Sequence, residues 1–97
     1  MDLAAQEFVR LCDVAIAEAM RVAEELRQAG GPGGSLEMAA LTVENLQKLR
    51  QSAVDETLLR PSLGAGLGLS RGVGDWTEDD GLMAAVRQVE RHYREKM

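Results

Sequence analysis

The sequence predicts an all-α fold, in which an antiparallel pair of helices is followed by a third, C-terminal helix. Apolar residues recur at helical spacing in three stretches of the 97-residue chain, and segments rich in glycine and proline separate these stretches. Aromatic residues make up only 3% of the chain, so its core must consist of leucine, valine, alanine and methionine, which suit helix packing. A chain of this length forms one small domain, which we expect to cover residues 1–97.

The first helix is expected over residues 2–28. Its apolar residues recur at alternating steps of three and four and form one stripe, and a second apolar set lies beside that stripe. Because this face is wider than one neighbouring helix would cover, we expect two helical neighbours. A small domain also gains buried surface by self-association, so we predict a homodimer whose interface lies on this face, at Phe8, Cys12, Ala15, Ile16, Ala19 and Met20.

The second helix is expected over residues 35–59, antiparallel to the first. The glycines and the proline of residues 30–34 end the first helix, and Ser35 then serves as the N-cap of the second. Pro61 disfavours helical geometry at Arg60 and sets the C-terminal limit. The buried stripe of this helix is predicted to consist of Leu36, Ala39, Val43, Leu46, Leu49, Ala53 and Leu58.

Residues 61–76, PSLGAGLGLSRGVGDW, largely alternate a glycine or serine with a larger residue. Successive residues of an extended chain point to opposite faces, so this pattern predicts a ribbon with one apolar face and one nearly bare face. We expect the apolar face to be buried and the glycine face to lie close against a helix or another backbone. A flexible glycine-rich linker is the alternative.

The third helix is expected over residues 77–96. Thr77 and Asp80 form a variant of the capping box, and the acids at this helix start complement the helix dipole. Trp76 directly precedes the predicted cap, where an apolar residue packs on the first turns of the helix; a contact with a partner is the second interpretation of this residue. The buried stripe is predicted to be Leu82, Val86, Val89 and Tyr93.

A basic face on this third helix offers a second kind of function. Arg87, Arg91 and Arg94 share one side of the helix, an arrangement able to contact the phosphates of a nucleic acid. The structural alternative is a solvated face with intrahelical ion pairs, such as Glu90 with Arg94. The formal net charge of −5 favours this alternative, because proteins that bind phosphate backbones are usually basic.

No residues in the sequence indicate catalysis, a cofactor or a metal site. The glycines of residues 64–68 lack the patterns of dinucleotide-binding and phosphate-binding loops. His92 has no second ligand at metal spacing, and Cys12 lies within an apolar stripe, so we expect a surface histidine and a buried thiol. The chain has neither a signal-peptide pattern nor an apolar run of membrane-spanning length, so we expect a cytoplasmic protein without a membrane segment.

These features together predict a non-enzymatic protein–protein interaction module of the adaptor, chaperone or inhibitor type, acting as a small acidic helical homodimer. We expect it to bind itself and another protein, and we identify no small-molecule substrate or cofactor. A nucleic-acid-binding module that uses the basic face of the third helix is the alternative. The residues predicted to contact a partner are Leu67, Leu69, Arg71, Trp76, Arg87, Arg91 and Arg94.

Overall fold

The computed structural model describes residues 1–30, 33–60 and 66–97, which form helices and no strand. The helices are α1 (Leu3–Ala29), α2 (Gly33–Val54), α3 (Leu69–Gly74) and α4 (Asp80–Lys96). The all-α prediction is therefore confirmed for the described residues, with one more helix than the sequence predicted. The molecule is elongated and measures 42 × 24 × 19 Å.

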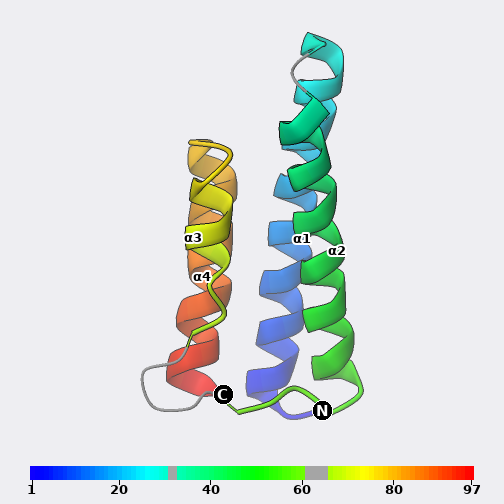
Figure 1. Cartoon of the computed structure of the whole chain (residues 1–97). Helices are drawn as coiled ribbons and strands as arrows, with labels where there is room; N and C mark the ends of the chain where they lie inside the picture. Colours follow the sequence, from blue (N-terminus) through cyan, green and yellow to red (C-terminus); the bar gives the residue numbers. More distant parts are fainter. Residues whose placement is uncertain (31–32, 61–65) are drawn as a thin grey trace.

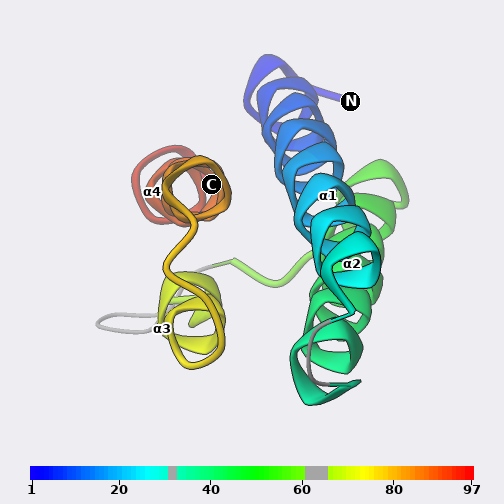
Figure 2. The same ribbon diagram turned by 90° about the horizontal axis from the view of Figure 1, so that it is seen from above.

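The helices form two unequal hairpins that meet along α1 and α4. α1 packs on α2 in a long antiparallel hairpin, α3 packs on α4, and α4 packs on α1 (Figure 1). α1 thus has two helical neighbours, as the width of its apolar face predicts. Seen from above, α4 lies beside α1, and α3 and α2 lie next to them on the same side of the α1–α4 contact (Figure 2). Both termini lie at the same end of the molecule.

The core lies where α1 meets α2 and α4. The ring of the fully buried Phe8 lies 6.2 Å from that of Tyr93, centroid to centroid. The Tyr93 hydroxyl donates to the carbonyl of Leu59 at 2.6 Å and so ties the segment after α2 to α4. His92, which is half-buried, uses Nε2 to donate to the carbonyl of Ala4 at 2.7 Å, since a carbonyl oxygen can only accept.

The predicted dimer interface coincides largely with this core. Phe8, Cys12, Ala15 and Ala19 are completely buried within the single chain, against α2 and α4. Ile16 is half-buried, and only Met20 is well exposed. The broad apolar face of α1 is therefore covered by two helices of the same chain, and it leaves those four side chains no surface to offer a second copy.

α1 follows its predicted bounds closely. Asp2 caps its start by accepting a hydrogen bond from the backbone N–H of Ala5 at 2.7 Å. Gly30 ends it in the left-handed conformation, with φ of 63°, where its N–H donates to the carbonyl of Arg27 at 3.3 Å. The predicted glycine stop is thus confirmed.

α2 is displaced from the predicted range of 35–59 at both ends. It begins at Gly33, so Ser35 lies inside its first turn and is not the N-cap. It ends at Val54, because Glu56 adopts a left-handed φ of 59° and the N–H groups of Thr57 and Leu58 turn back to the carbonyl of Ser52. No sequence pattern indicates a left-handed conformation at a glutamate. The predicted end of this helix, which was set by Pro61, is therefore wrong.

The extended ribbon is contradicted by α3, which occupies Leu69–Gly74. Gly68, with φ of 70°, turns the chain into this helix, and the N–H of Ser70 donates to the carboxylate of Glu90 on α4. Glu90 therefore caps α3. It does not form the ion pair with Arg94 that the sequence suggested. Leu69 and Val73 lie four residues apart and share a face both in a helix and in a strand, so the alternating pattern does not separate the two.

The glycines of this segment are also not in close contact with other backbone. A Cβ added at Gly66, Gly68 or Gly72 would meet no atom within 4 Å, and one at Gly74 would lie at an ordinary 3.5 Å from the side chain of Met83. The predicted close approach of a bare glycine face is therefore wrong for these positions. The part of the predicted ribbon at residues 61–65 lies outside the described residues.

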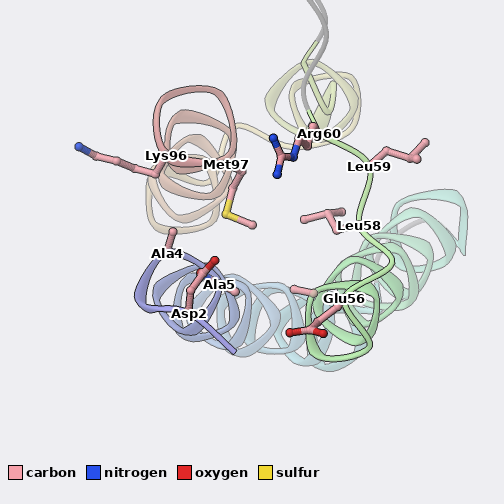
Figure 3. A pocket seen from close by; sticks show the side chains of 10 residues that line it. Asp2, Ala4, Ala5, Glu56, Leu58, Leu59, Arg60, Lys96 and Met97 are labelled. Atoms are coloured by element: carbon pink, nitrogen blue, oxygen red, sulfur yellow. The ribbon is translucent and has the colours of Figure 1, made fainter.

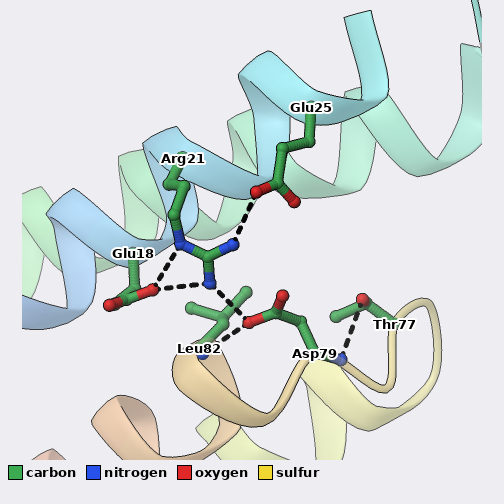
Figure 4. Close-up of polar contacts among 6 residues, drawn as sticks. All are labelled: Glu18, Arg21, Glu25, Thr77, Asp79 and Leu82. Carbon is green, nitrogen blue, oxygen red and sulfur yellow. Dashed lines mark hydrogen bonds and ion pairs between the residues drawn. The ribbon is translucent and has the colours of Figure 1, made fainter. Parts of the chain in front are cut away.

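α4 begins three residues later than predicted and is joined to α1 at its start. Its N-cap is Asp79, not Thr77, and the Asp79 carboxylate accepts from the N–H of Leu82 at 2.8 Å. The same carboxylate oxygen accepts from Arg21 of α1 at 2.7 Å (Figure 4). Arg21 also donates to Glu18 at 2.8 Å and to Glu25 at 2.9 Å, so one guanidinium joins three carboxylates.

Candidate functional site

The side of the molecule between α2 and α3 is open. α2 packs mainly on α1, and α3 packs on α4, so these two helices lie on the same side of the molecule without packing closely on each other (Figure 2). Two hollows lie along this space, and each has α2 as one wall and part of residues 67–78 as the other. We call the two hollows together the α2–α3 groove.

The α2 wall of the groove is a second face of that helix, beside its buried stripe. Asn45, Leu49 and Ser52 line one hollow and Met38 lines the other, at helical steps of three and four. Leu41 falls on the same face by this register. Met38 is 39% exposed and Leu41 is 45% exposed. The part of α2 that does not contact α1 is therefore partly apolar.

The opposite wall consists of side chains that the sequence singled out. Leu67 and Leu69 line a hollow of about 300 Å³ together with Leu49. Trp76 lines a wider hollow of about 810 Å³ near the start of α2, together with Met38. Three of the seven predicted partner-contacting residues are thus brought to one groove, and α2 supplies the side that sequence reasoning missed.

The hollow beside Trp76 is rimmed by carboxylates. Glu37 of α2 and Asp75 and Glu78 of the α3–α4 connection line it, and all three are exposed. No lysine or arginine lines this hollow, and none of the three carboxylates makes an ion pair with another of the described residues. At the other hollow, Lys48 is the only charged lining residue among those described. The groove therefore has one negative end.

Trp76 belongs both to the edge of the core and to the groove. The indole is half-buried and packs against the core cluster, while it also lines the groove. Its Nε1–H is buried and has no hydrogen-bond partner within the described structure. An unsatisfied buried donor costs about 1–3 kcal/mol, so the indole is held there by its apolar contacts and not by a polar anchor.

The other predicted contact residues do not join the groove. Arg87, Arg91 and Arg94 are exposed on α4, and Arg91 donates to Glu95 at 3.3 Å. Arg71 is exposed on α3 and lines neither hollow of the groove. The predicted residues therefore separate into an apolar set in the groove and a basic set outside it, on α3 and α4.

A further hollow of about 260 Å³ lies at the end of the molecule where both termini meet. Leu58, Arg60 and Met97 point into it, whereas Leu59 and Lys96 point away (Figure 3). Asp2 and Glu56 also line it, so charges of both signs surround a small apolar floor. This hollow is small and mixed in charge, and its chemistry indicates no particular ligand.

The described residues contain no arrangement that indicates catalysis. No three His, Cys, Asp or Glu side chains within the described ranges come together in a way that could hold a metal ion. Burial, and secondarily the charge of Asp13, raises the pKa of the Cys12 thiol to about 12, so this cysteine is protonated at neutral pH. Nor is any helix in those ranges long and apolar enough to cross a membrane.

Comparison with models of known protein families found no match, and comparison with curated proteins and with solved structures found none either.

Proposed function

We propose that this chain acts by binding another protein in the α2–α3 groove, and not by catalysis. The observation that carries the proposal is the partly exposed apolar face of α2 opposite Leu67, Leu69 and Trp76, with no element of the described chain between them. Binding of a third surface that covers two facing apolar surfaces and removes them from water lowers the free energy of the complex. Adaptor, chaperone and inhibitor roles all remain compatible with this activity.

The predicted homodimer enters this proposal as a competing occupant of the groove. The face of α1 on which it was based is covered within the chain, as described above. A second copy would therefore have to bind through other exposed apolar residues, and Met38 of the groove is one of them. Nucleic-acid binding through Arg87, Arg91 and Arg94 is the other alternative, supported by the exposure of these side chains.

Site-specific photocrosslinking in cells of the source organism tests the proposal. By helical register, a photoreactive amino acid at Leu41 would lie on the face of α2 that carries the groove residues Met38 and Asn45, and the same group at Gln47 would lie on the opposite, exposed side of α2. We expect one discrete adduct from Leu41 that is absent from Gln47. Equal adducts from both positions, or none from either, would contradict the proposal.

The nucleic-acid alternative has its own test. Binding to a duplex that weakens steeply with salt and is lost when Arg87, Arg91 and Arg94 are changed to glutamine would favour it. The proposed protein-binding function expects no difference between that triple variant and the parent chain in the crosslinking experiment, because these residues lie outside the groove.

A further inference from the structure

We infer that the occupant of the α2–α3 groove is an amphipathic helix of a different protein, with lysine or arginine residues at the end that lies beside Trp76. This inference rests on the proposed function and adds to it the conformation and charge of the partner segment.

The helical conformation follows from the walls of the groove. In the described residues both walls are side chains of helices and their connections, and no strand edge is present to pair with an extended peptide. An extended segment would lose water from its own backbone N–H and C=O groups without replacement, whereas a helix satisfies those groups internally. A helix along the α2 wall from Met38 to Ser52 would be about 21 Å long, or about four turns.

The charge of the partner follows from the negative end of the groove. Glu37, Asp75 and Glu78 surround the hollow beside Trp76 and are not neutralised by any described cation, as shown above. An acidic partner would be repelled there, and an uncharged one would leave the carboxylates unpaired. Lysine or arginine at the corresponding end of the partner helix would form new ion pairs, which favour fast association and correct register.

A second copy of this chain fits the groove less well. Its exposed large apolar side chains within the described ranges include none from α4, the helix that carries the basic face. The cations of α1 and α2 already pair with carboxylates of the chain itself, namely Arg10 with Glu7, Arg21 with Asp79, Arg27 with Glu24, Lys48 with Glu44 and Arg50 with Asp13. No described helix of this protein therefore offers an apolar stripe together with free cations.

The test is a selection of helical peptides by the full chain. The probe is a display library of peptides of about 18 residues that lack tryptophan, with a fixed leucine stripe and random residues at both ends. We expect enrichment of lysine and arginine at one end only. Trp76 is the only tryptophan, so a change in its fluorescence on addition of an enriched peptide reports binding beside it.

Two charge variants make the test specific. The triple variant Glu37→Gln, Asp75→Asn, Glu78→Gln should bind an enriched peptide about tenfold more weakly. The matched control Glu24→Gln, Asp55→Asn, Glu95→Gln changes the net charge equally at exposed carboxylates that line neither hollow of the groove and should bind as the parent does. Equal weakening in both variants would overturn the charge assignment.

The other possible results of the selection also test the inference. Enrichment without a charge preference would overturn the basic end and leave the proposed function intact. No enrichment at all would overturn the helical occupant, while the crosslinking at Leu41 would judge the proposed function independently. A mass near twice 10.5 kDa by light scattering that falls to the monomer value in Leu41→Glu would assign the groove to a second copy and overturn a different partner.

Discussion

At the scale of single residues, Arg21 joins the two hairpins through a shared network of ion pairs. It joins Glu18 and Glu25 of its own helix to Asp79, the N-cap of α4, at the place where α1 and α4 meet. Exposed ion pairs stabilise little, but this one belongs to a network, and the side chain of Asp79 is only 23% exposed. The contact therefore contributes to how α4 is placed on α1.

This pair predicts a specific dependence of stability on pH. Arg21, and then the N–H of Leu82, lower the pKa of Asp79, so this carboxyl stabilises the fold above its unfolded pKa of about 3.9 and loses that effect as the pH falls through its folded pKa. Asp79→Asn keeps a capping oxygen but removes the charge. We expect it to cost about 1 kcal/mol at pH 7 and much less at pH 3.

Urea denaturation of the parent and Asp79→Asn at both pH values measures this difference. Arg21→Gln should show the same trend, because it removes the other charge of the pair. A loss of equal size at pH 3 and pH 7 would show that the cap, and not the ion pair, is what the substitution disturbs.

Cys12 provides a second prediction at this scale. Its side chain is completely buried, and burial raises the pKa of its thiol to about 12, so the reactive thiolate is scarce at pH 8. We expect a disulfide reagent to modify it only as fast as the fold opens. Val14→Cys in a Cys12→Ala background places a thiol at a site that is 45% exposed in the parent and should react much faster. Equal rates would show that α1 is not packed in solution as described.

At the scale of helices, α3 is the element with the weakest local support. It has six residues, three of which are neither glycine nor serine, and its cap comes from Glu90 of another helix. An isolated helix of this length would not form in water. α3 therefore depends on Leu69 and Val73 packing against α4, and its glycines oppose it.

Alanine substitutions at two nearby glycines, Gly72 and Gly68, should have opposite effects on the stability of the protein. Gly72 lies inside α3 and its added Cβ would meet nothing within 4 Å, so Gly72→Ala should stabilise the protein by about 0.5–1 kcal/mol. Gly68 has φ of 70°, so Gly68→Ala should cost about 1–2 kcal/mol through backbone strain. Thermal denaturation of both variants checks the pair; an extended or disordered segment would show no gain for Gly72→Ala.

Comparison of the helices explains what the sequence can predict. α1 was predicted within one residue at each end, since its cap, apolar stripe and glycine stop are local features. The end of α2 was missed because the left-handed turn falls on a glutamate, and α3 was missed because its cap and packing come from α4. Local chemistry sets the bounds of α1, whereas contacts within the folded chain set the end of α2 and the formation of α3.

One wall of the candidate site was also predicted from the sequence, and the other was not. Leu67 and Leu69 were predicted as contact residues from the apolar face of the glycine-rich segment, and Trp76 from the second interpretation of its place before the helix cap. Met38 and Leu41 were missed, since only the assembled fold determines which face of α2 is left without a neighbour. A helix with two apolar faces looks the same in sequence whether both faces are covered or one is free.

At the scale of the whole molecule, the two hairpins are joined on one side and open on the other. α1 and α4 carry the contact between them, whereas α2 and α3 remain apart. The arrangement resembles a bundle with one position vacant. Natural proteins keep exposed apolar surface at binding sites even though polar residues there would cost the fold nothing.

This openness predicts that residues of one helix divide into two energetic classes. Leu46 of α2 is completely buried, so Leu46→Ala should destabilise the protein by about 2–5 kcal/mol. Leu41 is 45% exposed on the same helix, and glutamine is a good helix former, so Leu41→Gln should change stability by less than about 0.5 kcal/mol. Urea denaturation at pH 7 measures the stability of both variants. Because Leu41→Gln is expected to keep a stable fold, a loss of binding by this variant in the crosslinking and peptide experiments can be attributed to the groove. A cost for Leu41→Gln as large as that for Leu46→Ala would mean that α2 and α3 close on each other in solution and that Leu41 belongs to the core.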